Sequence, residues 1–570
     1  MILRNILLVS LASAFLISCG GDDAKPHPDA LIQTNQGSIQ GVTTNTDGIY
    51  TFNGIPYAAA PVGDLRWAAP EIAPIWNETR EASEFGNRCM QPVSMEGGFL
   101  DRLIEGQGLN GVKTWAIKRV IAGSEALPMS EDCLYLNVRT GSLKESEKKP
   151  VMVWIHGGGH QFGSADTSFY QANGLVEKDV VLVTINYRLG VFGYMAHPAL
   201  SAADPNGVSG NYGTLDQMAA LKWVRDNISA YGGDASNITI FGESAGAWSV
   251  TELMASPLAA GLFDKAIAQS GASTYHLGLM EGDGVGWPSG YSMGEKVAQS
   301  VGLNTPTAAE LRAVPAEMIM ANLPEKADEA FHHIRDGYVF PKNVGHAFRE
   351  GDINAVPFMT GYNADEASLF FPDDPEPSVW IEGLEREDAD LQRTMLDAAY
   401  PNQGGALQSL YSLTDHFDMG GMDMMGDDIF GVNIRMAAES NEATGQPTFA
   451  YHFTRLPPSD KQTVGAYHTA EIPFVFNSIE PALGNSNEDE LLADAMGTYW
   501  TNFAKTGNPN MPVTPETSWP VYAGQNWMVL SANTGWAITE VQADIRKDKL
   551  DALETGLESK LNALEAVLNP

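Results

Sequence analysis

Basic side chains are scarce in this sequence. Its 570 residues include 34 lysines and arginines against 71 aspartates and glutamates, which gives a formal net charge of −37 at pH 7. Such a chain repels the phosphates of nucleic acids and the headgroups of anionic lipids, and no basic block reverses the sign locally. We therefore expect an acidic, solvated surface and no nucleic-acid partner.

Long apolar runs are missing as well, apart from one short segment at the N-terminus. The stretch "ILLVSLASAFLIS" is too short to span a bilayer but suits a secretory signal core. It runs into "LISC", which resembles the cleavage box of bacterial lipoproteins and ends at Cys19. We predict a signal peptide over residues 1–18, a lipid anchor on Cys19 and a polar tether over 19–30; an ordinary signal peptide with an incidental cysteine is the alternative. Gly20, rather than an aspartate, follows the cysteine and favours the outer membrane, with the protein facing the periplasm or the exterior.

Cysteine is nearly absent, with three in the whole chain. If Cys19 carries lipid, an even pair, Cys89 and Cys133, is left in an oxidising compartment, where disulfides form. Closing the loop between them stabilises a fold by at most about 4 kcal/mol on chain-entropy grounds. Two free buried thiols are the alternative.

Neither a fixed-period repeat nor a linker divides the sequence, so we expect residues 31–570 to form a single domain. Turn-rich short strands come first, in "LIQTNQGSIQGVTT" and "GIYTFNGIPYA". Apolar strands of the kind buried on both faces follow in "VMVWIHGGG", "VVLVTINYRLGVFGYM", "NITIF", "DKAIAQSG" and "VPFMTG". Helical stretches alternate with them, and one has Thr214 and Gln217 at capping-box spacing. This alternation predicts an α/β fold with a mostly parallel central sheet, N-terminal antiparallel strands, and helical or irregular cap segments near 275–345 and 370–445.

Ser244 lies between Gly242 and Gly246 in "NITIFGESAGAWSV", where an apolar strand ends and a helix-prone stretch begins. A second G-x-S-x-G match, around Ser292 in "GYSMG", has no strand before it, and we assign that serine to a turn. A nucleophile elbow needs both the strand and the helix, because the tight turn raises the serine hydroxyl above the sheet edge. The context predicts Ser244 as a nucleophile, with the amide of Ala245 facing the oxygen of the attacked carbonyl.

A glycine-rich loop, "WIHGGGH", ends an earlier strand. Glycines there expose their amides without side-chain obstruction, so Gly158 and Gly159 are further candidate donors to an oxyanion. A phosphate-binding loop is one alternative, but the sequence lacks the G-x-x-x-x-G-K-[ST] pattern. A plain strand-ending turn is the other.

A serine nucleophile needs a base and an acid that orients it, and in α/β-hydrolases the acid and then the histidine follow the serine along the chain. Asp365 and Glu366 both come just after the strand "VPFMTG". Among the later histidines, His416 lies in a methionine- and aspartate-rich segment and His452 inside the strand-like "TFAYHF". His468, in a turn before an apolar run, is best placed to reach into a pocket.

These motifs, together with "FNGIPYAAAPVGDLRW", "EDCLYLNV", "NYRLGVFGY" and "GNYGTLDQMAALKWV", occur in the order in which the type-B carboxylesterase and cholinesterase family has them. The sequence closely resembles that family over nearly everything after the tether. The resemblance implies the α/β-hydrolase fold and a serine esterase that hydrolyses small carboxylic esters through an acyl-enzyme, with no metal or organic cofactor. The site residues that it implies are a Ser244, Glu366 and His468 triad, oxyanion donors on Gly158, Gly159 and Ala245, and a disulfide between Cys89 and Cys133.

The sequence departs from the family's pattern near the expected site. His160 follows the triple glycine where an aromatic or small residue is usual, and Ala367 stands where glycine is common. The stretch between the two cysteines is longer than in cholinesterases, and we do not equate its Trp115 with their choline-stacking tryptophan. Choline esters are therefore not the expected substrate; esters of aromatic, polyester-like or toxin type are alternatives, and a non-catalytic binding protein is disfavoured by the intact triad.

The sequence also predicts the structure of a methionine-rich segment and of the C-terminus. "HFDMGGMDMMGDD", around Met422, mixes methionine with aspartate and predicts a flexible apolar loop lining a pocket, with a copper-type methionine cluster as the alternative. At the C-terminus, leucines three or four apart predict a helix with one apolar stripe that packs on its own domain or joins a homodimer. These leucines are Leu550, Leu553, Leu557, Leu561, Leu564 and Leu568.

Overall fold

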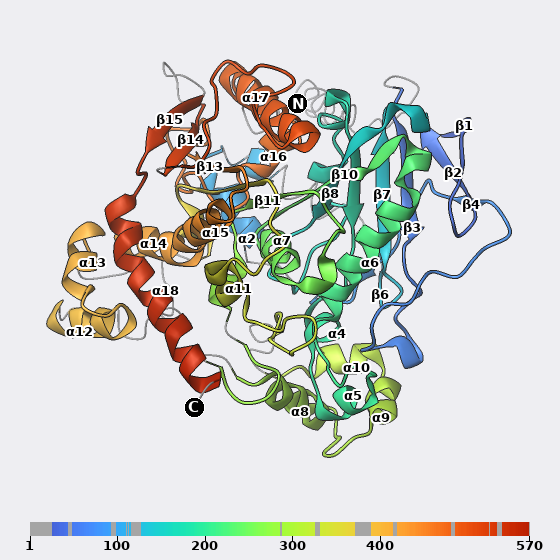
Figure 1. Ribbon diagram of the computed structural model, residues 1–570, viewed down its shortest axis with the longest axis horizontal. Helices are drawn as coiled ribbons and strands as arrows, with labels where there is room; N and C mark the ends of the chain where they lie inside the picture. The colour runs from blue at the N-terminus through green and yellow to red at the C-terminus, as the bar shows by residue number, and fades with distance from the viewer. Residues whose placement is uncertain are drawn as a thin grey trace, which may run out of the picture.

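The computed structural model describes the chain from residue 25 to residue 568 (Figure 1). The predicted signal peptide and Cys19 lie outside the described residues. The tether prediction is wrong in part, because strand β1 (Lys25–Gln33) already pairs with β2 (Ser38–Thr43) and buries Ala30. Not described within this span are residues 44–47, 93–98, 110, 112, 116–126, 277, 285–287, 325–330, 371–388, 414–418, 480–484, 524 and 533–538.

One large mixed sheet organises the molecule. Its strands run parallel from β9 to β14, and antiparallel strands flank this parallel part on both sides, so the predicted α/β fold and N-terminal antiparallel strands are confirmed. A short strand, β4 (Arg80–Glu81), pairs with β2 beside this order. Across the sheet the order is β1, β2, β3 (Tyr50–Pro56), β7 (Tyr135–Thr140), β9 (Val181–Ile185), β8 (Lys149–Ile155), β10 (Gly233–Glu243), β11 (Lys265–Gln269), β12 (Phe358–Asn363), β13 (Thr448–Phe453), β14 (Asn526–Leu530) and β15 (Thr539–Ala543).

Both faces of the parallel strands are buried, which explains their continuous apolar runs. Along β8, Val151 and Val153 belong to one apolar core and Met152 and Trp154 to another, as the two-residue period of a strand requires. The first core is covered by α6 (Tyr212–Asn227), α7 (Ala245–Ala255), α11 (Val344–Glu350) and α15 (Val432–Ala443), and the second by α16 (Ile472–Val475) and α17 (Asn487–Thr506).

Helix α6 does not begin with the predicted capping box. Its N-cap is Asn211, and the first helical residue is Tyr212. Thr214 and Gln217 are instead buried, and both donate hydrogen bonds to side chains of α7. The capping prediction is therefore wrong, because these two polar side chains are used between helices.

The stretch expected as one long strand after "VVLVTI" is also divided. Strand β9 ends at Ile185, and Gly190–Tyr194 form the short helix α4. Gly190 has a φ of +48°, a left-handed conformation that turns the chain out of the strand direction.

The segments expected to cap the sheet do so only in part. Helices α11 and α15 cover it, as described above. Helices α8 (Gly290–Ser300), α9 (Ala308–Ala313) and α10 (Ala316–Ala321) pack instead with α4 and α5 (Pro198–Ala203) around a separate apolar cluster below the sheet in Figure 1. Ser292 lies in the first turn of α8 and its amide bonds to the Ser289 cap, so it is a helical residue and not a turn residue.

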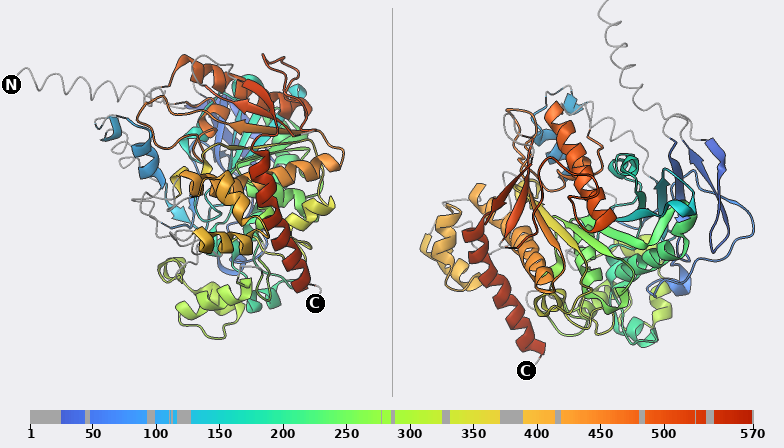
Figure 2. Two further views of the ribbon diagram at one scale, coloured as in Figure 1. Left: turned by 90° about the vertical axis from the view of Figure 1, so that its left-hand side faces the viewer. Right: turned by 45° about the horizontal axis from the view of Figure 1, so that its top comes forward.

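The C-terminal helix is confirmed as α18 (Lys547–Leu568), which runs along one side of the molecule (Figure 2). Its leucine stripe is buried against helices α12 (Ala389–Ala399), α13 (Gly404–Leu410), α14 (Met419–Gly426) and α15 of the same chain. Of the two alternatives for the stripe, the structure therefore favours packing on its own domain. Among the helices of the described ranges, none has the length and apolarity needed to cross a membrane.

Candidate active site

Ser244 occupies a strained turn between β10 and α7. Its φ of 57° and ψ of −124° are rare for a residue with a side chain. The backbone is held there by two hydrogen bonds: its amide donates to the Gln269 carbonyl at 2.9 Å, and its carbonyl accepts from the Trp248 amide at 2.9 Å. The side chain is half-buried, so its hydroxyl stays accessible at the turn. This is the geometry of a nucleophile elbow.

The two flanking glycines are required by close backbone contacts. A Cβ on Gly242 would lie 2.5 Å from the Gly246 carbonyl carbon, and a Cβ on Gly246 would lie 2.0 Å from the carbonyl oxygen of Ile155. Both distances are far below van der Waals contact. The glycines therefore let α7 start directly against the end of β8.

The glycine loop after β8 lies against this elbow. A Cβ on Gly157 would be 3.0 Å from the Cβ of Ser244. Gly158 and Gly159 have φ angles of +103° and +61° and are partly exposed, while the Gly158 carbonyl closes the turn by accepting from the Gln161 amide at 2.9 Å. Ala245 is the first residue of α7, where backbone amides have no acceptor within the helix. The three predicted oxyanion donors thus come from two adjoining segments.

Glu366 and His468 meet in a buried hydrogen bond. Glu366 opens a 3₁₀ turn, Glu366–Leu369, directly after β12, and its Oε2 lies 2.6 Å from Nδ1 of His468. Its Oε1 accepts from the Asn363 amide at 2.7 Å, which fixes the carboxylate. Asp365 was the other candidate for the acid. Its carboxylate instead accepts a hydrogen bond from the Ala466 amide at 2.7 Å. Glu366, and not Asp365, therefore contacts the imidazole.

The other imidazole nitrogen faces a residue that sequence reasoning missed. Nε2 of His468 lies 3.2 Å from Oε1 of Glu243, the residue before Ser244, and no hydrogen bond joins this nitrogen to Ser244 Oγ among the described residues. Because Glu243 adjoins Ser244, Nε2 lies at the elbow. The only sequence signal for Glu243 was a carboxylate inside the G-x-S-x-G motif itself.

The protonation of these groups is set by burial and by neighbouring carboxylates. Burial lowers the pKa of His468, but Glu243 and Glu366 outweigh it and raise that pKa to about 9. Burial raises the pKa of Glu243 well above its ordinary value. Glu243 therefore favours the protonated form of His468 only while Glu243 itself is ionised.

Two aromatic rings shield the histidine. The ring centroids of Phe370 and Phe430 lie 5.1 Å and 4.8 Å from that of His468. Phe430 belongs to a π-helical turn, Asp427–Gly431, inserted between α14 and α15, and such turns often occur at functional sites. The rings keep water away from the imidazole, which strengthens its interaction with Glu366.

The remaining candidates lie elsewhere. His452 is buried in β13 against Tyr362, as expected for a packed residue, and His416 lies outside the described residues. The methionine-rich segment is the helix α14 and not a loop, although Met422 does line a cavity of about 410 Å³. Within the described parts of the chain, no group of three or more His, Cys, Asp or Glu side chains is arranged to hold a metal ion.

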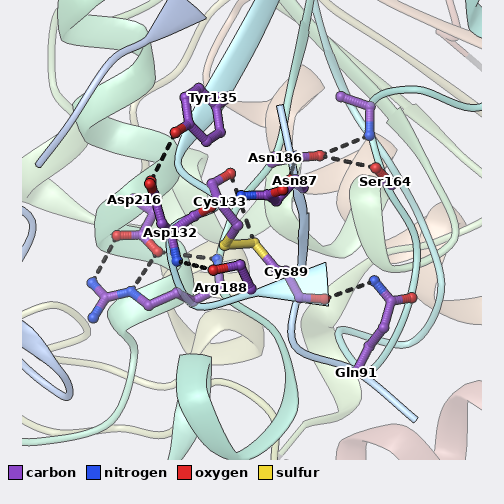
Figure 3. The surroundings of a disulfide bond; sticks show 12 residues. Asn87, Cys89, Gln91, Asp132, Cys133, Tyr135, Ser164, Asn186, Arg188 and Asp216 are labelled. Carbon is purple, nitrogen blue, oxygen red and sulfur yellow. Dashed lines mark hydrogen bonds and ion pairs between the residues drawn. A yellow bond between two sulfur atoms is a disulfide. The ribbon is translucent and has the colours of Figure 1, made fainter. Parts of the chain in front are cut away.

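The predicted disulfide is present (Figure 3). It joins Cys89 to Cys133. Gln91 exchanges two hydrogen bonds of 3.0 Å with the backbone of Gly163, and Asn186 accepts from the Ala165 amide at 2.8 Å. These amide contacts between distant segments had no signal in the sequence. They tie the disulfide region to the chain that follows the glycine loop.

Comparison with known proteins agrees with this arrangement. The sequence profile of the "Carboxylesterase family" matches residues 28–552. The fumonisin B1 esterase of Sphingopyxis macrogoltabida is 32% identical over 520 residues, which cover 89% of this chain and 87% of that protein. The para-nitrobenzyl esterase of Bacillus subtilis is 32% identical over 504 residues, covering 86% of this chain and 92% of that one. A crystal structure of a Geobacillus stearothermophilus carboxylesterase superposes with a TM-score of 0.74 at 31% identity, covering 92% of this chain and 100% of that chain. The fold is thus the α/β-hydrolase fold of esterases, and the chain belongs to the carboxylesterase family.

Proposed function

We propose that this carboxylic ester hydrolase works through a Ser244, His468 and Glu366 triad. The observation that carries the proposal is the 2.6 Å contact between Glu366 and His468 Nδ1, made beside the strained serine turn. Glu366 holds the imidazole with its proton on Nδ1, which leaves Nε2 to act as the base. The positive-φ glycine loop and the first turn of α7 provide the amides for the oxyanion.

The reaction then proceeds in two halves. Ser244 Oγ attacks the ester carbonyl carbon while His468 Nε2 takes the hydroxyl proton, and the amides of Gly158, Gly159 and Ala245 stabilise the oxyanion. The carbon–oxygen bond to the alcohol breaks as His468 returns the proton to the leaving oxygen. Water repeats the sequence on the acyl-enzyme and releases the acid. Nε2 exchanges its contact with Glu243 for Ser244 Oγ, since catalytic hydrogen bonds often tighten only when substrate is bound.

A nucleophile test checks the proposal. Ser244→Ala should lower kcat by about 10⁴- to 10⁶-fold, the range for a triad nucleophile, with the fold retained because only one accessible hydroxyl is removed. The matched control is Ser292→Ala, the other G-x-S-x-G serine, which should leave kcat unchanged. A fluorophosphonate should label Ser244 alone. Ester hydrolysis at near wild-type rate in Ser244→Ala would reject the proposal.

The names of the relatives suggest a first set of substrates to test. The two bacterial relatives are named for a para-nitrobenzyl ester and for fumonisin B1. We propose small carboxylic esters as substrates, and a hydrolysis screen over acyl and alcohol sizes, with fumonisin B1 included, separates a broad esterase from a specialised one. Specificity of this kind depends on the pocket walls.

We also propose that the mature protein is a membrane-anchored lipoprotein through Cys19. Support comes from the short apolar segment that ends at this cysteine and from the start of β1 at Lys25, which leaves a short tether. The Cys19→Ser protein should leave the membrane fraction while retaining activity. Continued fractionation with membranes would reject the anchor.

A further inference from the structure

His160 has a backbone conformation that needs support. It follows Gly159 and continues the run of positive φ angles with a φ of 57°. For a residue with a side chain, such a conformation is unfavourable and persists only where the surroundings hold it. The carbonyl of His160 accepts a 2.7 Å hydrogen bond from the Gly190 amide, and the side chain is fully buried. The support therefore comes from both the backbone and the side chain.

The side chain reaches across to the helix that carries the nucleophile. Nε2 of His160 lies 3.1 Å from the carbonyl oxygen of Ala245 and 3.0 Å from Oγ of Ser249. Ala245 is one predicted oxyanion donor, and the backbone of His160 ends the loop that contains the other two. One imidazole thus links the two segments that form the oxyanion hole.

The neighbours of Nε2 fix the tautomer of His160. The carbonyl oxygen of Ala245 can only accept, so Nε2 of His160, 3.1 Å away, is the donor. The Ser249 hydroxyl, which accepts from Gln217 Nε2 at 2.8 Å, lies 3.0 Å from the same carbonyl. Nδ1 carries the lone pair, in keeping with its burial without a hydrogen-bond partner among the described residues. Burial lowers the pKa of His160, which favours this neutral form.

The ring itself is held in place by aromatic neighbours. It stacks on Tyr194 with a centroid distance of 4.8 Å and an interplanar angle of 18°, and it meets Trp248 edge-on at 5.8 Å. An aromatic residue such as phenylalanine fits such a site by size but has no N–H to donate. The specific contribution of histidine here is therefore the Nε2 hydrogen bond.

We propose that His160 is a positioning residue that holds the glycine-loop amides and the Ala245 amide in register around the oxyanion. The inference rests on the proposed triad mechanism. Donors to an oxyanion act in the transition state, where small displacements weaken them. Loss of the Nε2 donor should therefore lower kcat while leaving KM nearly unchanged.

The test compares two replacements of the same side chain. His160→Phe keeps an aromatic ring and removes the donor, whereas His160→Gln places an amide N–H near the position of Nε2. We expect His160→Phe to lower kcat per titrated active site about 10- to 100-fold with KM within twofold, and to weaken a trifluoromethyl ketone inhibitor by a similar factor, because that inhibitor's hemiketal oxygen occupies the oxyanion hole. His160→Gln should recover most of both losses.

Other outcomes overturn the inference. An unchanged kcat per titrated site in His160→Phe, a loss confined to KM, or equal losses in the Phe and Gln variants would each assign His160 a packing role only. If His160→Phe does not fold, ¹⁵N-histidine NMR of the native protein replaces it. The proposal requires the signal of a neutral imidazole protonated on Nε2, and the signal is assigned to His160 by its absence in His160→Gln. A different protonation state at His160 overturns the inference. A failure of the triad itself shows separately, as activity that survives Ser244→Ala.

Discussion

At the residue scale, the pairing of His468 with two carboxylates is the feature that affects chemistry most. Glu366 holds Nδ1 and Glu243 faces Nε2, so an ionised Glu243 adds to the stabilisation that Glu366 gives the imidazolium. In the proposed mechanism His468 is the general base, and it must be neutral to accept a proton. The activity of this enzyme should therefore rise with pH through the pKa of His468.

The first prediction concerns Glu243→Gln. The neutral amide cannot stabilise the imidazolium, so the pKa of His468 should fall from its raised value of about 9, and the rise of the kcat/KM profile should shift to lower pH by about one unit or more. A pH series of kcat/KM with one ester measures the shift. Asp365→Asn is the matched control, because Asp365 is a neighbouring carboxyl group that does not contact the imidazole. A shift to higher pH, or equal profiles for both variants, would contradict the role given to Glu243.

At the element scale, the start of α6 is joined to the chain after β9 by a buried ion pair. Arg188 forms two 2.7 Å bonds with the Asp216 carboxylate, which also accepts from the Arg188 amide at 3.1 Å. Both side chains are nearly fully buried. Removing one partner of such a pair leaves an uncompensated charge in the interior.

The second prediction follows from that pair. Asp216→Asn should lower the free energy of unfolding by about 3–5 kcal/mol, measured by urea denaturation. Asp226→Asn on the same helix is the control, since the Asp226 side chain pairs with Lys222 at 3.0 Å on the exposed surface and the loss of this pair should cost less than about 1 kcal/mol. Similar costs for the two variants would mean that the buried pair contributes little.

At the scale of the whole molecule, α18 closes one side of the fold. Its leucines fill an apolar cluster with residues of α12 to α15, so the last element of the chain completes a core built from segments more than a hundred residues earlier. Polar residues beside the leucine stripe also hold the helix on its own chain: Glu554 pairs with Arg435, and Glu558 and Asn562 bond Arg349 at 3.0 and 3.1 Å.

The third prediction uses that helix. Leu557→Ala should lower the free energy of unfolding by about 2–5 kcal/mol, because Leu557 is only 4% exposed, whereas Val567→Ala on the same helix should change it little, since Val567 is 52% exposed. Light scattering on the Cys19→Ser protein should give the mass of one chain. A dimer that dissociates in Leu557→Ala would instead assign the leucine stripe to an interface between copies.

Much of the architecture and many of the candidate residues were predictable from local patterns. The strands β8, β10, β11 and β12 have continuous apolar runs. The glycines around Ser244 indicate a turn with close backbone contacts, and the structure has these contacts. Segments with weaker patterns were assigned less well. Thr214 and Gln217 have the spacing of a cap but serve helix contacts, and α8 to α10 form their own cluster rather than covering the sheet.

The sequence by itself determined which residue types stand at strand ends, where the chain must turn, and that it has too little positive charge for nucleic acid. The pairing of Glu366 with a histidine 102 residues away came from the family resemblance and not from local patterns, and the structure shows the contact. Only the tertiary structure decided that Glu243 meets the other nitrogen of that ring and that His160 meets Ala245 across 85 residues. The physical reason is that periodicity, glycine geometry and strand propensity act over a few residues, whereas hydrogen bonds and buried charges depend on how the sheet brings distant strand ends to one edge.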